Sequence, residues 1–250
     1  MEFVSLIIYG VLGLVIGSFL NVVICRVPKG ESIVAPGSHC PECGHFLRSW
    51  ELIPIISFIL LRGKCSRCGL KISLRYPAIE TLTGVLFVLT YLTRSDRSTA
   101  GIILDLAFVA LLIVLTFIDI DSFRLPDIFV IMVALTGLIN TLVTSDPVFW
   151  RSLLAAGLAG GVFALIAYFY AEGMGWGDVK FVAALGLYLG FPKILIAVFI
   201  ASLLGVVIGG GQIILYKKDL KDPIPFGPFL AGGAVIMLIF GQQIVEYLHF

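Results

Sequence analysis

The chain has 250 residues, of which 59% are hydrophobic and only 13% are charged, and its formal net charge is +1. Average globular domains carry roughly 25% charged residues. The mean hydropathy of +1.07 excludes a disordered chain, a nucleic-acid-binding protein driven by a basic surface, and a water-soluble enzyme with one ordinary core. The apolar residues come in long unbroken runs without alternation, which disfavours a transmembrane β-barrel. We therefore expect an all-α polytopic protein embedded in a lipid bilayer.

The apolar runs predict about eight transmembrane helices, with seven as the alternative. A bilayer requires about 20 mostly apolar residues per helix. The first run, residues 3–24, is too long for a signal-peptide core and lacks a small-residue cleavage site, so we interpret it as a retained span. The others are residues 77–93, 100–118, 127–145, 151–171, 179–190, 191–215 and 227–247. The run 179–190 is short, which is typical of a tilted helix or of a broken element beside a water-filled site.

The basic residues predict the orientation, because Lys and Arg accumulate in cytoplasmic loops. With the N-terminus outside, the outer segments hold only four of the 17 Lys and Arg residues: Arg94, Arg97, Arg151 and Lys193. The other basic residues, including Lys217, Lys218 and Lys221, then lie inside. We therefore predict a multi-pass protein of a bacterial inner membrane, with a periplasmic N-terminus and a cytoplasmic loop at residues 25–76.

By composition the chain divides into three parts: a first transmembrane helix at residues 1–24, the polar loop at 25–76, and a membrane bundle at 77–250. Four of the five cysteines lie in the loop, as Cys40-Pro-Glu-Cys43-Gly and Cys65-Ser-Arg-Cys68-Gly. Two such knuckles separated by 21 residues predict a structural, tetrahedral Zn²⁺ site. The alternatives are two disulfides, which a reducing compartment disfavours, or four free thiols.

Between the knuckles, residues 52–61 are apolar apart from one serine and contain a proline. Such a segment is too short to span a bilayer. We expect it to pack the small zinc domain against the membrane face.

Acidic residues inside or beside apolar runs are costly and indicate function. Here they are Glu80, Asp105, Asp119, Asp121, Asp127 and Asp178. Asp119 and Asp121 are two residues apart, so on one helix they point in nearly opposite directions. Asp119 lies deeper in its run and is the better candidate for an inward-facing catalytic group. Asp127, which follows a proline, has the alternative role of a helix N-cap.

A glycine-rich segment, Gly173-Met-Gly175-Trp-Gly177-Asp178-Val-Lys180, precedes another apolar run on the same predicted membrane face. Glycines permit close approach of a peptide or a neighbouring helix, and the alternative is a turn in which Asp178 caps its helix. If the carboxyls of Asp119 and Asp178 meet, they cannot both ionise cheaply, so the pair shares a proton. One partner can then accept a proton from water while the other donates a hydrogen bond to a scissile carbonyl.

Taken together, these motifs resemble those of the type IV prepilin peptidases, a family of intramembrane aspartyl proteases that often also act as N-methyltransferases. The shared features, in order, are Gly17-Ser-Phe-Leu-Asn21 through Pro28, the two cysteine knuckles, Arg75-Tyr-Pro-Ala-Ile-Glu80, the segment from Asp119 to Leu-Pro-Asp127, the glycine-rich segment, and Pro225-Phe-Gly-Pro-Phe229. Each motif alone is modest, but the order is specific.

The resemblance implies cleavage of the short basic leader of type IV prepilins or type II secretion pseudopilins, after a glycine and usually before a phenylalanine. It implies that Asp119 and Asp178 are the catalytic aspartates. Supporting candidates from the same motifs are Asp121, Asp127, Gly175, Gly177 and Lys180.

The resemblance also implies a second activity. Members with the zinc-binding loop typically N-methylate the new N-terminus with S-adenosylmethionine, so we associate residues 25–76 with that activity. Asn21, Arg26 and Glu80 flank the loop at the membrane boundary and are the candidates for binding the cofactor. Asn21 and Glu80 have the alternative role of hydrogen-bonding between helices.

Three other functions compete. A peptidase without methyltransferase activity would use only the aspartates. A transporter would use membrane acids and broken helices as an ion pathway, but the acids cluster on one side and the chain shows no internal repeat. A zinc-dependent sensor or scaffold would explain the cysteines and leave the aspartates without a role.

Overall fold

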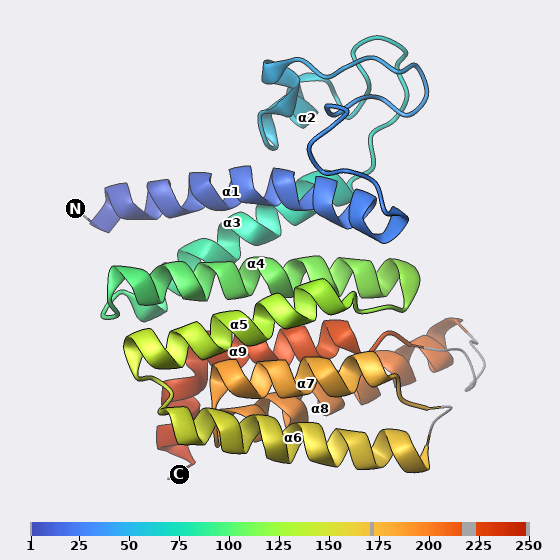
Figure 1. The fold of residues 1–250 in the computed structure, drawn as a ribbon. Helices are drawn as coiled ribbons and strands as arrows, with labels where there is room; N and C mark the ends of the chain where they lie inside the picture. Colours follow the sequence, from blue (N-terminus) through green and yellow to red (C-terminus); the bar gives the residue numbers. More distant parts are fainter. Residues whose placement is uncertain (1, 171–172, 217–223, 249–250) are drawn as a thin grey trace. The chain divides into compact units, whose positions relative to one another are not determined.

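The computed structural model describes residues 2–170, 173–216 and 224–248 and is helical throughout the membrane-embedded part (Figure 1). The helices are α1 (Glu2–Arg26), α2 (Ile56–Leu60), α3 (Arg75–Arg94), α4 (Thr99–Ser122), α5 (Asp127–Thr144), α6 (Phe149–Phe169), α7 (Trp176–Leu189), α8 (Lys193–Tyr216) and α9 (Gly227–Tyr247). Within the described ranges there is no β-strand, only two isolated bridges in the polar loop. Lys217, Lys218 and Lys221 lie outside the described residues. The all-α prediction is confirmed.

The chain divides into two compact units, Met1–Leu92 and Thr93–Phe250. The first unit contains α1, the polar loop and most of α3, and the second contains α4 to α9. The division falls near the end of α3.

In the first unit, α1 and α3 approach closely through small residues. A Cβ atom on Gly13 would lie 2.7 Å from the Cα of Gly84, and one on Gly17 would lie 2.8 Å from the Cα of Glu80. Contacts of this kind let two backbones pack where lipid supplies no hydrophobic driving force. They bring the turn of α3 that carries Glu80 against the middle of α1.

In the second unit, successive helices alternate in direction, so that α4 ends where α5, α7 and α9 begin (Figure 1). Helix α4 is the central helix: 67% of its most apolar window is buried, against 22–44% for the corresponding windows of α5, α6, α8 and α9. This antiparallel order gathers sequence segments that are far apart at one end of the bundle.

Seven helices of the described part are long and apolar enough to cross a membrane: α1, α3, α4, α5, α6, α8 and α9. The chain is thus a multi-pass membrane protein. The run expected at 179–190 forms α7, which has 14 residues and is about 21 Å long, less than the roughly 30 Å of a hydrocarbon core. Judged by length, seven of the described helices can span a membrane, which is the alternative number that the sequence allows. Helix α7 is the short element.

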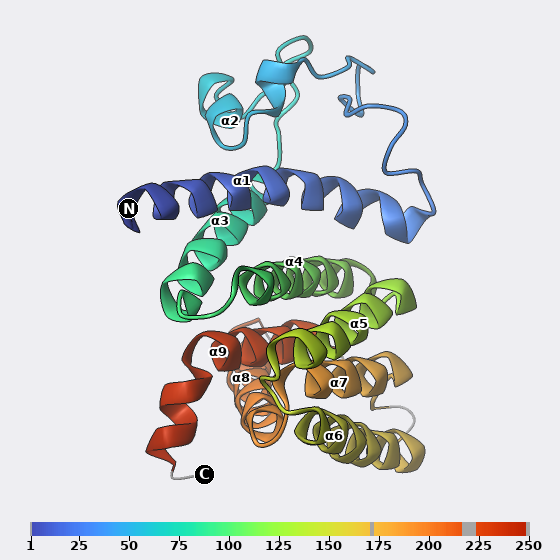
Figure 2. The same ribbon diagram turned by 60° about the vertical axis from the view of Figure 1, so that its left-hand side comes forward.

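Helix α7 tolerates its short length because other helices surround it. It lies between α5 and α6 in both views (Figures 1 and 2). A Cβ atom on Gly137 of α5 would lie 2.8 Å from the backbone N of Tyr188, and one on Gly186 would lie 2.8 Å from the backbone of Ala155 in α6. A helix that is enclosed by other helices does not contact lipid along its length, so its length does not have to match the thickness of the bilayer.

Asp105, near the start of α4, is fully buried and belongs to an ion-pair network. Its carboxylate accepts hydrogen bonds from Arg97 Nη1 at 2.7 Å and from the Tyr188 hydroxyl at 2.6 Å, and Arg94 Nε lies 3.4 Å away. Arg97 also donates to the side chain of Asn140 in α5 at 3.0 Å. Among the acidic residues singled out by the sequence, Asp105 therefore joins α4, α5 and α7 and has a structural role.

We expect Asp105→Asn to destabilise the protein by about 3 kcal/mol, because Arg97 would lose its buried counter-charge and Arg94 would keep only the half-exposed Asp146, 3.7 Å away. In detergent micelles the unfolding temperature should fall on the order of 5–10 °C. Asp96→Asn, a change at an exposed acid nearby, is the matched control. Equal unfolding temperatures for the two variants would contradict the structural role of Asp105.

Candidate active site and metal centre

Asp119 lies in the last turn of α4, where the helix stops. Phe123 takes a left-handed conformation with φ 52° and its N–H bonds the carbonyl of Asp119, so the chain turns away after Asp121. Asp119 is buried, with 5% of its surface exposed, whereas Asp121 is exposed. The backbone N–H of Gly227, at the start of α9, donates to Asp119 Oδ2 at 3.0 Å.

Asp178 lies in the first turn of α7. Gly175 is the N-cap residue of this helix, and the backbone N–H of Asp178 bonds the Gly175 carbonyl at 3.1 Å. The expectation that Asp178 itself caps the helix is therefore wrong. A Cβ atom on Gly175 would lie 3.6 Å from Asp178 Oδ2, so the glycine leaves the carboxyl uncovered on that side.

Leu125 connects the segments that carry the two aspartates. A Cβ atom on Gly177 would lie 3.4 Å from Leu125 Cβ, and one on Gly227 would lie 3.1 Å from Leu125 Cδ2. The α4–α5 turn is thus wedged between the start of α7 and the start of α9. The absence of side chains at both glycines allows this close approach.

Asp127 and Lys180 form an ion pair beside the aspartates. Lys180 Nζ lies 2.9 Å from Asp127 Oδ1 and 3.0 Å from Oδ2, and both side chains are more than half exposed. The N-cap residue of α5 is Pro126, so the alternative role of Asp127 as an N-cap is wrong. The exposed pair fastens α5 to α7 at the active-site end and contributes little to stability by itself.

The four cysteines of the polar loop meet at one point, their sulfur atoms all within 4.8 Å of one another. Cys40 Sγ lies 3.7 Å from Cys68 Sγ, and Cys43 Sγ lies 4.0 Å from Cys65 Sγ. Because Zn–S bonds are about 2.3 Å, the sulfurs of a tetrahedral Zn site are about 3.8 Å apart. The cluster fits Zn²⁺, and all five cysteines are free of disulfides, as predicted.

The two knuckles have matching backbones. The N–H of Gly44 bonds the Cys40 carbonyl and that of Gly69 bonds the Cys65 carbonyl, both at 3.0 Å. Both glycines have positive φ, 66° and 74°, which explains why glycine follows each motif. The backbone N–H groups of Cys68 and Arg67 lower the pKa of Cys65 to about 6, which favours the thiolate that a metal requires.

Glu51 is a buried residue that sequence reasoning missed, and it joins the two knuckles. Its carboxylate accepts the backbone N–H of Arg48 at 2.7 Å and the hydroxyl of Ser66, and it contacts His45 Nε2 at 3.2 Å. The first two of these hydrogen bonds are the main causes that lower the pKa of Glu51. The signal was available: it is the acid nearest the apolar segment 52–61 on its N-terminal side.

A cavity of about 490 Å³ lies within the first unit, between α1, the start of α3 and the polar loop. All three predicted cofactor residues line it: Asn21, Arg26 and Glu80. Asn21 donates to the carbonyl of Tyr76 at 3.2 Å, and Glu80 accepts the backbone N–H of Ile55 at 2.8 Å. The structure therefore brings these residues to one hollow, where they also hold the loop against the helices.

Comparison with known proteins gives a consistent result. Residues 11–94 match the bacterial peptidase A24 N-terminal domain, and residues 106–210 match the type IV leader peptidase family. The chain belongs to the type IV leader peptidase family. It is 34% identical to proteins named prepilin leader peptidase/N-methyltransferase from Stutzerimonas stutzeri, over 96% of this chain and 92% of the relative, and from Bacillus subtilis, over 95% of each. No solved structure matches the chain.

The candidate active site spans several separate motifs of the sequence. The residues around Asp119 come from the end of α4 and from the starts of α7 and α9. Of these residues, only Gly227 lies far in sequence from any predicted catalytic residue. Gly227 belongs to the motif Pro225-Phe-Gly-Pro-Phe229, to which the sequence analysis assigns no role. Its role is visible only in the fold, because the donor is a backbone N–H and leaves no signature beyond the glycine.

We expect Cys43→Ser to abolish stoichiometric zinc and to expose residues 30–70 to proteolysis, because a structural zinc ion supplies folding energy. Metal analysis of the purified protein and limited trypsin digestion measure the two effects. Cys25→Ser removes a thiol outside the cluster and should leave both unchanged. Zinc-free wild-type protein with a protease-resistant loop would contradict the site.

Proposed function

We propose that the chain removes the basic leader of type IV prepilins or type II secretion pseudopilins and N-methylates the new N-terminal residue. The observation that carries this proposal is that the segments of Asp119 and Asp178 gather around Leu125, which packs against Gly177 beside Asp178 and against Gly227, the donor to Asp119. The names of the relatives, prepilin leader peptidase/N-methyltransferase, support both activities. We assign the protein to a bacterial inner membrane, with this end of the bundle and the zinc loop in the cytoplasm.

The aspartates act as one unit that holds a single proton between them. The ionised carboxylate accepts a proton from water, whose oxygen attacks the scissile carbonyl carbon. The protonated carboxyl donates a hydrogen bond to the carbonyl oxygen. As the C–N bond breaks, the carboxyl that accepted the proton of water gives it to the leaving amine. The Gly227 N–H, at 3.0 Å from Asp119, fixes the orientation of that carboxyl.

The substrate suits this placement. The basic leader stays on the cytoplasmic side, and the apolar segment that follows lies in the membrane, so the scissile Gly–Phe bond is at the interface. Asp119 is three residues from the end of the 24-residue helix α4, about 5 Å along the axis. The pair is therefore at the depth where the bond is expected.

Replacing either aspartate by asparagine should reduce leader cleavage at least about 10³-fold, because neither proton transfer can then occur. Mass spectrometry of a prepilin incubated with purified Asp119→Asn or Asp178→Asn measures the loss. Zinc content and unfolding temperature should remain those of the wild type, and Asp96→Asn should cleave normally. Retained cleavage by either aspartate variant would refute the assignment.

Gly227→Ala should reduce turnover more than tenfold, because the new Cβ would lie 2.7 Å from Asp119 Oδ2 and would displace the carboxyl. The matched control is Gly232→Ala on the same helix, whose Cβ would meet nothing closer than 3.9 Å. Initial rates of prepilin cleavage compare the two. Equal rates would show that Asp119 tolerates displacement and does not depend on this contact.

We further assign the cavity of the first unit to S-adenosylmethionine. Its volume of about 490 Å³ is in the range of cofactor sites, and its polar groups suit a cofactor that carries a sulfonium, an amine and a carboxylate. Glu80 offers a negative charge, Arg26 a positive charge and Asn21 an amide. The cofactor supplies a methyl group, which the freed amine of the cleaved substrate accepts.

Glu80→Gln removes the negative charge and keeps an oxygen for the Ile55 N–H, so the fold should survive. We expect methylation to fall at least tenfold while cleavage changes less than about twofold. Mass spectrometry with and without S-adenosylmethionine separates the two products. Thr81→Ala, at the exposed neighbouring position, is the control. A wild-type enzyme that cleaves but never adds a methyl mass would leave a peptidase only.

A further inference from the structure

We infer that the apolar segment 52–61 of the polar loop inserts into the bilayer leaflet beside the middle of α1 and forms the lipid-facing wall of the cavity. A loop that only rested on the membrane surface would lie beyond the ends of α1 and α3. This segment instead runs back alongside α1, level with the middle of that helix in both views (Figures 1 and 2).

The hydrogen bond from the Ile55 N–H to Glu80, 2.8 Å long, sets the depth of the segment. Glu80 packs against Gly17, nine residues before α1 ends at Arg26, which corresponds to about 13 Å along the axis. A hydrocarbon core of roughly 30 Å, centred on a helix of 25 residues, begins about 4 Å from each end. Ile55 therefore lies several ångströms inside the core, the depth typical of an interfacial segment.

The side chains of the segment separate into two faces. Leu52, Ser57, Phe58 and Leu61 line the cavity. Ile56, Ile59 and Leu60 face the other way and are 54%, 66% and 68% exposed. No charged residue occurs between Glu51 and Arg62. An exposed apolar face of this kind requires a partner, and the lipid-facing side of α1, with Val11 and Val15 more than half exposed, lies in the same unit.

Basic residues stand at both ends of the segment. Arg48 precedes it and Arg62 and Lys64 follow it, and all three are exposed. Long basic side chains reach phosphate headgroups while their neighbours stay in the acyl region. Charge and apolar surface thus both select a lipid bilayer as the occupant of this face.

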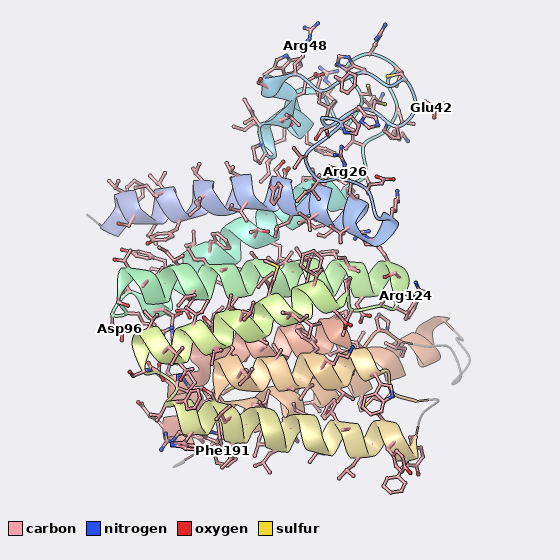
Figure 3. The ribbon with its side chains drawn as sticks, in the orientation of Figure 1. Arg26, Glu42, Arg48, Asp96, Arg124 and Phe191 are labelled. Atoms are coloured by element: carbon pink, nitrogen blue, oxygen red, sulfur yellow. The ribbon has the colours of Figure 1, made fainter. Side chains whose placement is uncertain are left out.

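The test is depth-dependent quenching in nanodiscs, which needs no enzymatic activity and so does not rest on the proposed function. Trp50, Trp150 and Trp176 are first replaced by Phe, and one tryptophan is introduced at a time. Fluorescence of Ile59→Trp should fall at least twofold when the lipids carry bromine on their acyl chains. Val11→Trp on α1 is the positive control, and Glu42→Trp, at an exposed position of the same loop (Figure 3), should lose little.

Ile56→Trp provides a second probe on the same face if Ile59→Trp loses zinc or fails to purify. Quenching by brominated lipid at either position, together with protection from aqueous acrylamide, supports insertion. Emission at both positions that is insensitive to brominated lipid and quenched by acrylamide as strongly as at position 42 would overturn it.

Discussion

An apolar bundle can hold a carboxylate only where donors are supplied to it, and this constraint organises the whole chain. Asp105 is met by Arg97 and Tyr188, Asp119 by the N–H of Gly227, and Glu80 by the N–H of Ile55. All but the Arg97 bond join segments that are at least 25 residues apart in sequence. Because a buried acid is stable only with its own partner, these bonds favour this fold over other packings of the same helices.

Helix α7 shows how this constraint serves the active site. Its last turn carries Tyr188, which bonds the buried Asp105, and its first turn carries Asp178. The helix is enclosed by α5 and α6 and has glycine contacts on both sides. Asp178 therefore stands on a short element that is held at its far end, a rigid placement of the kind that a two-carboxyl site requires.

The zinc loop follows the same principle outside the bundle. The four cysteine sulfurs of the two knuckles meet at one point, and Glu51 joins the knuckles through Arg48, Ser66 and His45. The apolar segment continues from there, and its backbone reaches Glu80. The loop and the helices of the first unit together enclose one cavity.

The sequence by itself determined the membrane class, the all-α fold, the zinc knuckles and the acids worth considering. These follow from local signals: the length of apolar runs, the spacing of Cys-x-x-Cys, and the cost of a charge in lipid. It also separated Asp119 from Asp121, because helical periodicity points the two in nearly opposite directions and Asp119 lies deeper in its apolar run. Eight apolar runs are visible in the sequence. That the run forming α7 can stay shorter than a membrane span depends on the helices that enclose it.

Only the tertiary structure decided which acids have structural roles. Asp105 and Asp119 lie on the same helix and have similar apolar neighbours in sequence, yet one meets two arginines and the other meets a backbone N–H from α9. The roles of Gly227 and Leu125 were likewise invisible, because they depend on contacts between segments up to 108 residues apart. Sequence patterns specify local conformation, whereas the partner of a buried charge is set by the packing of the chain.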